Sequence, residues 1–453
     1  MRIFRSLRAW LPQYRENLSL ALPVMLSQVG QVVVQLCDNA MVGHLGALSL
    51  AAVSFGGAVF VIFLFFGTGI SMGLTPLVGE MYARHDYRTS ARLFQNSLVL
   101  NSVVGILLFA ILQVFGQCLG LMGQSEEVVA EAAPYYNYLA WSIIPFMIFA
   151  AFKQFLEGVG NTMTGMVVVL TANAINIFFN YLLIYGHGGF PAMGAAGAGL
   201  ATLISRICMP LFVLIYFIRV PSLRRYFRFF TWIAQGWRMT RRLLAVGLPI
   251  SMQMVLEVSA FALTLIMMGW IGTVEQAAHQ VVLSISNIVY MIIVGISSAT
   301  TIMVSHRYGV GDYRGLRRAA TASWHLGLVA NGLTMTCFIL FRHWLPLMFT
   351  SDEAVLAVAA QLFVMAAIYQ IPDGLQTIAL GVLRGMQDVR VTMNYAFVAY
   401  IVINLPVGYL CAFTLRLGAP GLWIGFIVGL TVAAILFITR YRRAARRLVM
   451  IKK

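Results

Sequence analysis

Long apolar segments recur along the whole chain, and they constrain the possible folds more than any other feature of the sequence. A run of about 20 apolar residues crosses a hydrocarbon core of about 30 Å as an α-helix. Only 10% of the 453 residues are charged, against roughly 25% in ordinary soluble domains. Transmembrane barrels instead show alternating strands of about ten residues. Because these runs are longer and continuous, the sequence predicts an all-α membrane protein.

Hydropathy, with Gly, Pro and charge clusters as breaks, predicts twelve transmembrane helices. Their expected bounds are 17–44, 49–76, 95–117, 134–156, 164–186 and 194–218, then 244–270, 277–303, 320–341, 356–382, 391–414 and 418–439. Nearly all Lys and Arg fall on one side of this arrangement; the exceptions are Arg206, Arg342 and Arg416. The positive-inside rule therefore places both termini in the cytoplasm. The first apolar segment is too long for a signal peptide and is expected to remain as the first helix.

The two halves of the chain repeat each other at an offset of about 226 residues. Matching pairs include Pro23 with Pro249, Gly43 with Gly269, Gly69 with Gly295, Asp86 with Asp312 and Tyr87 with Tyr313. Six spans per half is an even number, so the halves share one orientation and are related by a pseudo-twofold axis along the membrane normal. We expect an amino-terminal lobe of residues 1–220, a basic linker of 221–243, a carboxyl-terminal lobe of 244–440 and a basic tail of 441–453.

The formal net charge of +16 is distributed unevenly. In a soluble protein such an excess would suggest nucleic acid, but here it gathers on the predicted cytoplasmic side. The segment 219–242 is especially basic and is expected to lie on the inner membrane surface, where anionic lipid heads attract such charges. A solvated signal that only sets the topology explains the segment equally well. We expect no nucleic-acid partner.

Three of the 15 acidic residues fall inside predicted spans: Asp38 in the first, Glu257 in the seventh and Asp373 in the tenth. A carboxylate at the middle of a membrane costs about 3 kcal/mol on insertion scales, so such residues rarely persist without a role. The repeat pairs Asp38 with Thr264, and Glu257 with Gln31. Each acid thus lacks a counterpart, and seven residues, about 10 Å of helix, separate the two positions. We expect the lobes to hold their acids at different depths.

Aromatic side chains share a helix face with the two acids of the second half. Phe261 follows Glu257 by one turn, and Tyr369 precedes Asp373 by one turn. Carboxylate oxygens, a phenol and an aromatic face suit a desolvated monovalent or organic cation. Pro372 directly precedes Asp373 and is expected to kink its helix, which either exposes a carbonyl as a further cation ligand or serves packing alone.

Polar residues in the fifth and sixth spans allow two interpretations each. Asn173, Asn176 and Asn180 occur in the fifth span. The last two are four residues apart and either hydrogen-bond a buried acid such as Asp38 or join helices as structural amides. Arg206, in the middle of the sixth span, either pairs with an acid or extends its charge to the membrane surface. The sequence leaves both choices open.

No motif in the sequence indicates an enzyme. There is no Walker lysine loop, HExxH, GxSxG or clustered histidine. The five cysteines lie far apart without CxxC spacing, so neither a zinc site nor a disulfide framework is indicated. We therefore expect no catalytic activity and no cofactor, and we expect any work to be driven by ion gradients rather than by ATP.

Several segments together carry a family pattern. The first span ends in CDNAMVGHLG, the loop VGEMYARHDY is echoed by VSHRYGVGDY, and LEGVGNT and LRGMQD follow the fourth and tenth spans. In these segments and its distal acids the chain resembles the multidrug and toxic compound extrusion (MATE) family, specifically its NorM-type bacterial branch. The resemblance covers nearly the whole chain and implies two six-helix lobes around a central cavity. It also implies an inner-membrane antiporter that exports cationic amphiphilic drugs in exchange for Na⁺ or H⁺ by alternating access.

The resemblance further implies roles for individual residues. Asp38 resembles an acid implicated in coupling and substrate exchange, and Asn176 and Asn180 resemble its polar neighbours. Glu257 and Asp373 resemble the acids of a cation site, which favours Na⁺ without excluding H⁺. The aromatic surround of that site corresponds to Tyr369, Phe261 and Tyr290.

Two alternative functions stay open at this point. A lipid-linked oligosaccharide flippase of the same superfamily would more often show extra spans and a basic cavity. A cation channel would show a filter-like glycine segment, which the sequence lacks. Besides drugs and coupling ions, we expect membrane lipids as partners and a monomer, although no sequence feature bears directly on the oligomeric state.

Overall fold

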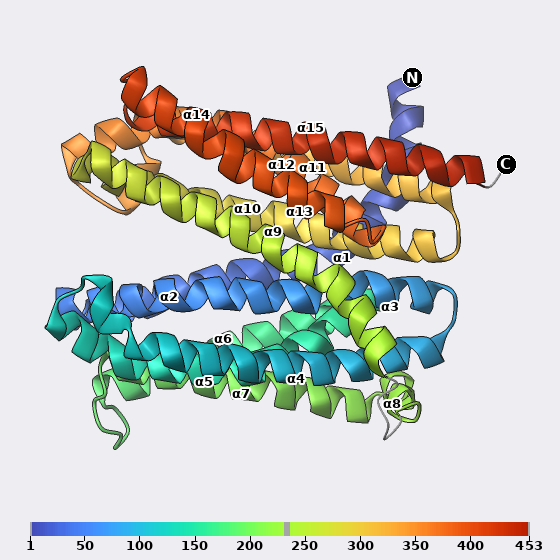
Figure 1. The fold of residues 1–453 in the computed structure, drawn as a ribbon, viewed down its shortest axis with the longest axis horizontal. Coiled ribbons are helices and arrows are strands. Elements are labelled where there is room, and N and C mark those ends of the chain that lie inside the picture. The colour runs from blue at the N-terminus through green and yellow to red at the C-terminus, as the bar shows by residue number, and fades with distance from the viewer. Residues whose placement is uncertain (1, 231–235, 452–453) are drawn as a thin grey trace. The chain divides into compact units, whose positions relative to one another are not determined.

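The computed structural model describes residues 2–230 and 236–451, and every regular element in these ranges is helical. Twelve of the described helices are long and apolar enough to cross a membrane, which confirms the predicted all-α membrane fold. They can be followed along the chain in Figure 1. The spans are formed by α1 (Arg2–Gly43), α2 (Ala47–Met72) with α3 (Leu74–Ala83), α4 (Tyr87–Gln117), α5 (Glu126–Gly158), α6 (Thr162–Tyr185), α7 (Ala195–Arg219), α9 (Gly236–Ile271), α10 (Thr273–Gly309), α11 (Tyr313–Phe341), α12 (Glu353–Gly385), a segment that begins with α13 (Arg390–Ala396), and α15 (Ala419–Ile451). Short helices between them are η1 (Leu119–Met122), α8 (Pro221–Phe227) and η2 (Leu345–Met348).

Many helices extend beyond the spans predicted from hydropathy. The third predicted span begins at residue 95, whereas α4 begins at Tyr87. Asp86 caps this helix, because its carboxylate accepts a hydrogen bond from the Thr89 backbone N–H at 2.9 Å. Asp312 caps α11 in the same way through the Gly315 N–H at 2.9 Å. Hydropathy detects only the apolar part of a helix, while the capping residue sets where the helix begins.

The eleventh span is less regular than the uninterrupted helix predicted over 391–414. After α13 come π-helical turns at Phe397–Asn404 and Leu410–Thr414, with α14 (Leu405–Tyr409) between them. Pro406 has no backbone N–H and cannot complete the α-helical hydrogen-bond pattern, which is a recognised cause of local irregularity. Tyr400 lies in the first π-helical segment, where it is buried.

Packing divides the chain into two compact units. The amino-terminal unit is Leu26–Ser251, and the carboxyl-terminal unit comprises the residues up to Met25 and those from Met252 onward. The first part of α1 therefore belongs to the carboxyl-terminal unit, and the first part of α9 belongs to the amino-terminal unit. The predicted lobes 1–220 and 244–440 assign them the other way round. In each helix the change of unit follows a proline by two residues, Pro23 in α1 and Pro249 in α9. A helix this long can bury its two ends in different surroundings.

A glycine contact holds the first part of each of these two helices. A Cβ atom on Gly69 of α2 would lie 2.4 Å from Ser251 Cα in α9. A Cβ atom on Gly295 of α10 would lie 2.3 Å from Met25 Cγ in α1. Gly69 and Gly295 are equivalent in the repeat, and so are Met25 and Ser251. Both units thus use the absence of a side chain to bring two helices into close contact.

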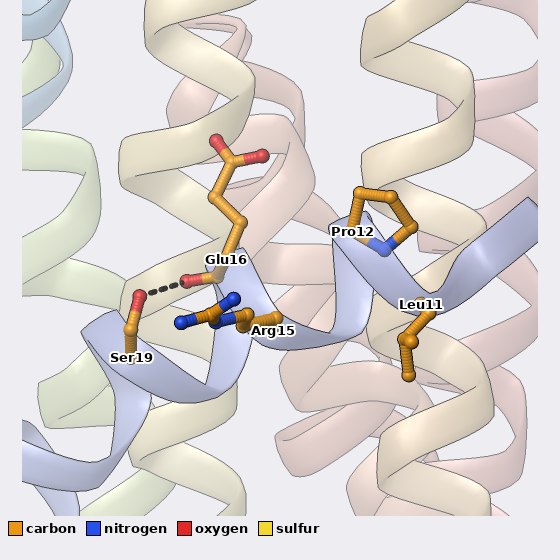
Figure 2. A pocket seen from close by; sticks show the side chains of 5 residues that line it. All are labelled: Leu11, Pro12, Arg15, Glu16 and Ser19. Carbon is orange, nitrogen blue, oxygen red and sulfur yellow. Dashed lines mark hydrogen bonds between the residues drawn. The ribbon is translucent and has the colours of Figure 1, made fainter. Parts of the chain in front are cut away.

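An ion pair also joins the first part of each of these helices to its own unit, and we call the two the α1 ion pair and the α9 ion pair. In the α1 ion pair, Arg307 Nη1 of α10 lies 3.0 Å from Glu16 Oε1, and its Nη2 lies 2.5 Å from Glu16 Oε2. In the α9 ion pair, Arg242 Nη2 lies 2.9 Å from Glu80 Oε2 of α3. Glu16 and Arg242 are equivalent in the repeat, so the two pairs have opposite polarity. Figure 2 shows Glu16 beside Arg15 in a surface pocket on α1.

Candidate functional site

The predicted acid of the amino-terminal unit, Asp38, is half-buried near the end of α1. Asn180 of α6 is fully buried, and its Nδ2 donates hydrogen bonds to the Asp38 carboxylate and, at 3.1 Å, to Asn176 Oδ1. Asn176 Nδ2 in turn donates to Thr202 Oγ1 of α7 at 3.2 Å. The structure therefore brings Asp38, Asn176 and Asn180 together in one hydrogen-bonded chain across three helices. Such a chain restricts the orientation of the carboxylate.

One acceptor atom within this hydrogen-bonded chain of side chains has no donor in the part of the protein that the structure describes. The Oδ1 of Asn180 is buried and has no hydrogen-bond partner among the described residues. Next to Asp38, it adds an amide oxygen that can accept from a donor or coordinate a cation. Asn173, although on the same helix, packs elsewhere: a Cβ on Gly30 of α1 would lie 3.1 Å from its Nδ2. The Asp38 site thus includes two of the three asparagines.

Arg206 of α7 is held by a hydroxyl group and two aromatic rings. Its Nη1 donates to Ser142 Oγ of α5 at 2.8 Å. The guanidinium carbon lies 5.0 Å from the ring centroid of Phe60 and 5.2 Å from that of Phe146. Cation–π contacts of this kind stabilise a charge that has lost water. Arg206 is thus bound within the helix packing of the amino-terminal unit.

In the carboxyl-terminal unit, Glu257 of α9 is hydrogen-bonded through both carboxylate oxygens. Gln253 Nε2, one turn earlier, donates to Oε2 at 2.8 Å. The Tyr290 hydroxyl of α10 donates to Oε1 at 3.3 Å. Arg384 Nη2 of α12 donates to Gln253 Oε1 at 2.6 Å. The amide of Gln253 therefore lies between the carboxylate and the guanidinium and separates the two charges.

Asp373 of α12 is 2% exposed and belongs to a second network. Gln376 Nε2 donates to Asp373 Oδ1 at 3.3 Å, and the Tyr400 hydroxyl donates to Gln376 Oε1 at 2.7 Å. Asn331 Nδ2 of α11 donates to the Gln370 carbonyl at 2.7 Å, two residues before Pro372. The helix α12 continues through Pro372 without interruption. The charges of Asp373 and Glu257 lie close enough to interact.

Aromatic side chains enclose the region around Asp373. Tyr369 is 5% exposed, and its ring centroid lies 5.6 Å from that of Trp423 and 6.2 Å from that of Phe426, both on α15. Phe261 stacks on Phe426 at 4.7 Å. Two of the three predicted aromatics, Tyr369 and Phe261, therefore meet through α15. Of these, only Tyr290 has a hydrogen bond to Glu257.

Sequence reasoning missed several residues that complete these networks, among them six around Glu257 and Asp373. Gln253 and Gln376 lie one turn from Glu257 and Asp373, so helical spacing was a usable signal for both. The others come from more distant parts of the chain or from positions without a sequence signal: Arg384, Tyr400, Trp423 and Phe426. The rotation of one apolar helix against another brings them in, and hydropathy does not report that rotation.

The chemistry that these groups offer is cation binding. No cluster of three or more His, Cys, Asp or Glu occurs within 2–230 and 236–451, whereas structural transition-metal sites usually use three or four such ligands. Carboxylate, amide and phenol oxygens suit hard cations. Aromatic faces suit organic cations. Acids with oxygen-rich surroundings thus occur in both units, and aromatic rings enclose those of the carboxyl-terminal unit.

Comparison with known proteins agrees with this arrangement. The sequence pattern of the MatE family matches residues 23–182 and again 249–410, so the same family pattern describes each half. The probable multidrug resistance protein NorM of Idiomarina loihiensis is 33% identical over 429 residues, which cover 94% of this chain and 93% of that protein. The multidrug resistance protein MdtK of Edwardsiella ictaluri is 33% identical over 438 residues, with 96% of each chain covered.

Solved structures agree on the fold. The eukaryotic MATE transporter AtDTX14 superposes with a TM-score of 0.88 at 20% identity and covers 97% of this chain and 98% of its own. An outward-facing multidrug resistance MATE transporter gives a TM-score of 0.88 at 21% identity, with 97% of each chain covered. At this identity the similarity concerns the fold alone.

Proposed function

Because the chain belongs to the MatE family, we propose that it is a secondary active transporter that exports organic cations across the bacterial inner membrane in exchange for Na⁺ or H⁺. Relatives that match over nearly their whole length are named multidrug resistance proteins. Twelve described helices suited to crossing a membrane are consistent with this role. The pattern of Lys and Arg further supports cytoplasmic termini.

The observation that carries the proposal is the presence of acids within predicted spans, with separate hydrogen-bonded surroundings in the two units. Exchange requires that a coupling ion and a cationic drug oppose each other's binding, and by linkage this opposition is reciprocal. Two unit charges about 4 Å apart interact by roughly 4 kcal/mol at an effective dielectric constant of 20. An ion and a drug that bind within this distance therefore oppose each other strongly enough to drive exchange.

We assign the coupling cation to the carboxyl-terminal unit. Glu257 and Asp373 supply the charge, the Tyr290 and Tyr369 hydroxyls are candidate oxygen ligands, and Phe261 contributes an aromatic wall. Na⁺ fits this set because oxygen ligands replace its hydration shell. A proton that binds to either carboxylate would serve the same exchange.

We assign the substrate, or a proton that exchanges with it, to the amino-terminal unit. Asp38 provides the charge, and Asn176 and Asn180 orient it. A carboxylate held by neutral amides keeps its negative charge available to a cationic drug. The many methionines and aromatics of the chain favour a surface that adapts to flat molecules of different shape.

Uptake into proteoliposomes tests the proposal. A fluorescent organic cation is followed while Na⁺ and pH gradients are imposed separately. Glu257→Gln and Asp373→Asn should abolish gradient-driven transport while the protein stays folded, because neutral amides keep the volume and remove the charge. Glu126→Gln, at an exposed acid in the first turn of α5, is the control.

Three outcomes would count against the proposal. Wild-type transport rates in both variants would remove Glu257 and Asp373 from the mechanism. Cation flux that persists without any gradient coupling would indicate a channel. Movement of lipid-linked sugars with no drug transport would favour the flippase function.

A further inference from the structure

The short helix α8, which follows α7, is attached to the amino-terminal unit by aromatic side chains. Tyr226 is 2% exposed and meets Phe155 edge-on at 5.0 Å between ring centroids. Phe227 lies 5.8 Å from Phe217 of α7. Phe230, just after α8, lies 5.8 Å from Phe94 of α4. One face of α8 is thus buried, so the opposite face has a defined position on the unit.

The opposite face of α8 is basic. Arg224, Arg225 and Arg228 are exposed, as is Arg219 at the end of α7. Arg225 lies over the Tyr87 ring, with its guanidinium carbon 4.3 Å from the ring centroid. This contact fixes one guanidinium and leaves the others directed to the surroundings. We call Arg219, Arg224, Arg225 and Arg228 the α8 basic surface.

The sequence on either side of these arginines supplies no acid to neutralise them. The sequence contains no Asp or Glu between Glu157 and Glu257. Within the described residues, no ion pair involves Arg224 or Arg228. Like charges held this close repel one another unless an external anion lies among them.

An exposed aromatic side chain identifies the kind of anion. Phe229 directly follows Arg228 and is 38% exposed. The bases of a single-stranded nucleic acid can also stack on such a ring, whereas an acidic peptide would gain little from it. At the end of membrane-spanning helices, however, an aromatic ring beside cations is the composition of a membrane interface. The membrane-spanning α4 and α7, against which α8 packs, place this surface at the end of two spans.

We propose that the α8 basic surface binds the phosphate headgroup of an anionic phospholipid, with Phe229 against the upper part of the acyl chains. Arg guanidinium groups suit this role because they bind phosphate oxygens in a bidentate way. With the cytoplasmic termini proposed above, the lipid belongs to the inner leaflet. The site is independent of the coupling-ion and substrate sites.

Lipid counting tests the proposal without any transport assay. The purified full chain in neutral detergent is titrated with phosphatidylglycerol or phosphatidylcholine, and bound lipids are counted by native mass spectrometry. The double variant Arg224→Gln with Arg228→Gln should bind phosphatidylglycerol roughly twenty- to thirtyfold more weakly, from about fivefold per arginine. Affinity in the wild type should also fall as salt is raised.

A matched control removes the same charge elsewhere. Arg314 and Arg318 are exposed residues of α11, which has no attached aromatic helix of this kind in its first turns. Replacing both with Gln should leave phosphatidylglycerol binding within about twofold. Replacing Arg224 and Arg228 with Lys should retain part of the affinity, because charge persists while bidentate geometry is lost.

Several results would overturn the proposal. One is equal phosphatidylglycerol binding by the wild type and the Arg224→Gln, Arg228→Gln variant when both have the same thermal stability. Another is an equal loss in the α11 control, which would indicate a non-specific charge effect. Displacement of the lipid by millimolar inorganic phosphate would identify a free-anion site, and tighter binding of a short oligonucleotide than of lipid would identify a polyanion site.

Discussion

Reversing the charge of Arg307 alone should break the α1 ion pair, whereas exchanging the charges of Glu16 and Arg307 should rebuild it. The amino-terminal unit contains an ion pair of opposite polarity, in which Arg242, the equivalent of Glu16, pairs with Glu80. Glu80 is equivalent to His306, the residue before Arg307. We therefore expect Arg307→Glu to destabilise the protein and Glu16→Arg, added to it, to recover most of the loss.

The size of the effect follows from the geometry of the pair. The contact is bidentate, with 3.0 Å between Arg307 Nη1 and Glu16 Oε1. The side chain of Arg307 is 18% exposed and that of Glu16 is 42% exposed. Roughly 4 kcal/mol is expected for a pair near a protein surface before solvent screening and the loss of hydration are counted. Because 42% of the Glu16 side chain is exposed to solvent screening, we discount the interaction to about 1–2 kcal/mol.

Thermal unfolding in detergent measures this interaction as a double-mutant cycle. A coupling of 1–2 kcal/mol corresponds to a few degrees in Tm, with the single variants low and the exchanged variant close to the wild type. Arg15→Gln is the control, because it removes a charge next to Glu16 without altering the pair. If the losses of stability in the two single variants add up to the loss in the double variant, the pair does not stabilise the first part of α1 and the reasoning is refuted.

Three further changes probe other contacts. Asn180→Ala should weaken binding of a fluorescent organic cation roughly tenfold, the loss expected for a hydrogen bond to a charged group, whereas Asn173→Ala should change it little; equal effects would exclude Asn180 from a specific role. Gly69→Ala should cost about 1–3 kcal/mol of stability through overpacking, while Gly332→Ala, with nothing within 4 Å of its Cβ, should cost none. Asp86→Ala should cost about 1 kcal/mol at neutral pH as a lost helix cap. Partial burial raises the pKa of Asp86, but hydrogen bonds from the first turn of α4 lower it more, so this stabilisation is complete above the unfolded pKa of about 3.9 and is lost as the pH falls through the lower folded pKa.

Features of the sequence that are local were predictable from it. Each span is recognisable as an apolar run, and the internal repeat at an offset of about 226 residues is visible without any structure. The intramembrane acids stand out because carboxylates are costly in a membrane. The hydrogen bonds from Asn180 to Asp38 and from Tyr290 to Glu257 join residues that the sequence had singled out.

Features that depend on the packing of one helix against another were not predictable. Helices that are apolar on every side give no periodicity that shows which face meets which neighbour. For this reason, the hydrogen bonds that Arg384 and Tyr400 contribute to the acid networks become visible only once the helices are packed. Helix packing also decides to which compact unit the first parts of α1 and α9 belong. The repeat predicts the order of the helices along the chain but not which helices they pack against.

The central claim is that a coupling cation bound at Glu257 and Asp373 opposes a drug bound through Asp38. The direct test is titration of the purified protein in detergent with a fluorescent organic cation at several Na⁺ concentrations, with choline holding the ionic strength constant. The Kd of the wild type for the dye should rise with Na⁺. Glu257→Gln should flatten that rise more than it changes the Kd without Na⁺. Asp38→Asn should mainly weaken binding of the dye. A Kd that ignores Na⁺ across the whole series would contradict direct Na⁺ competition and leave the proton as the coupling ion.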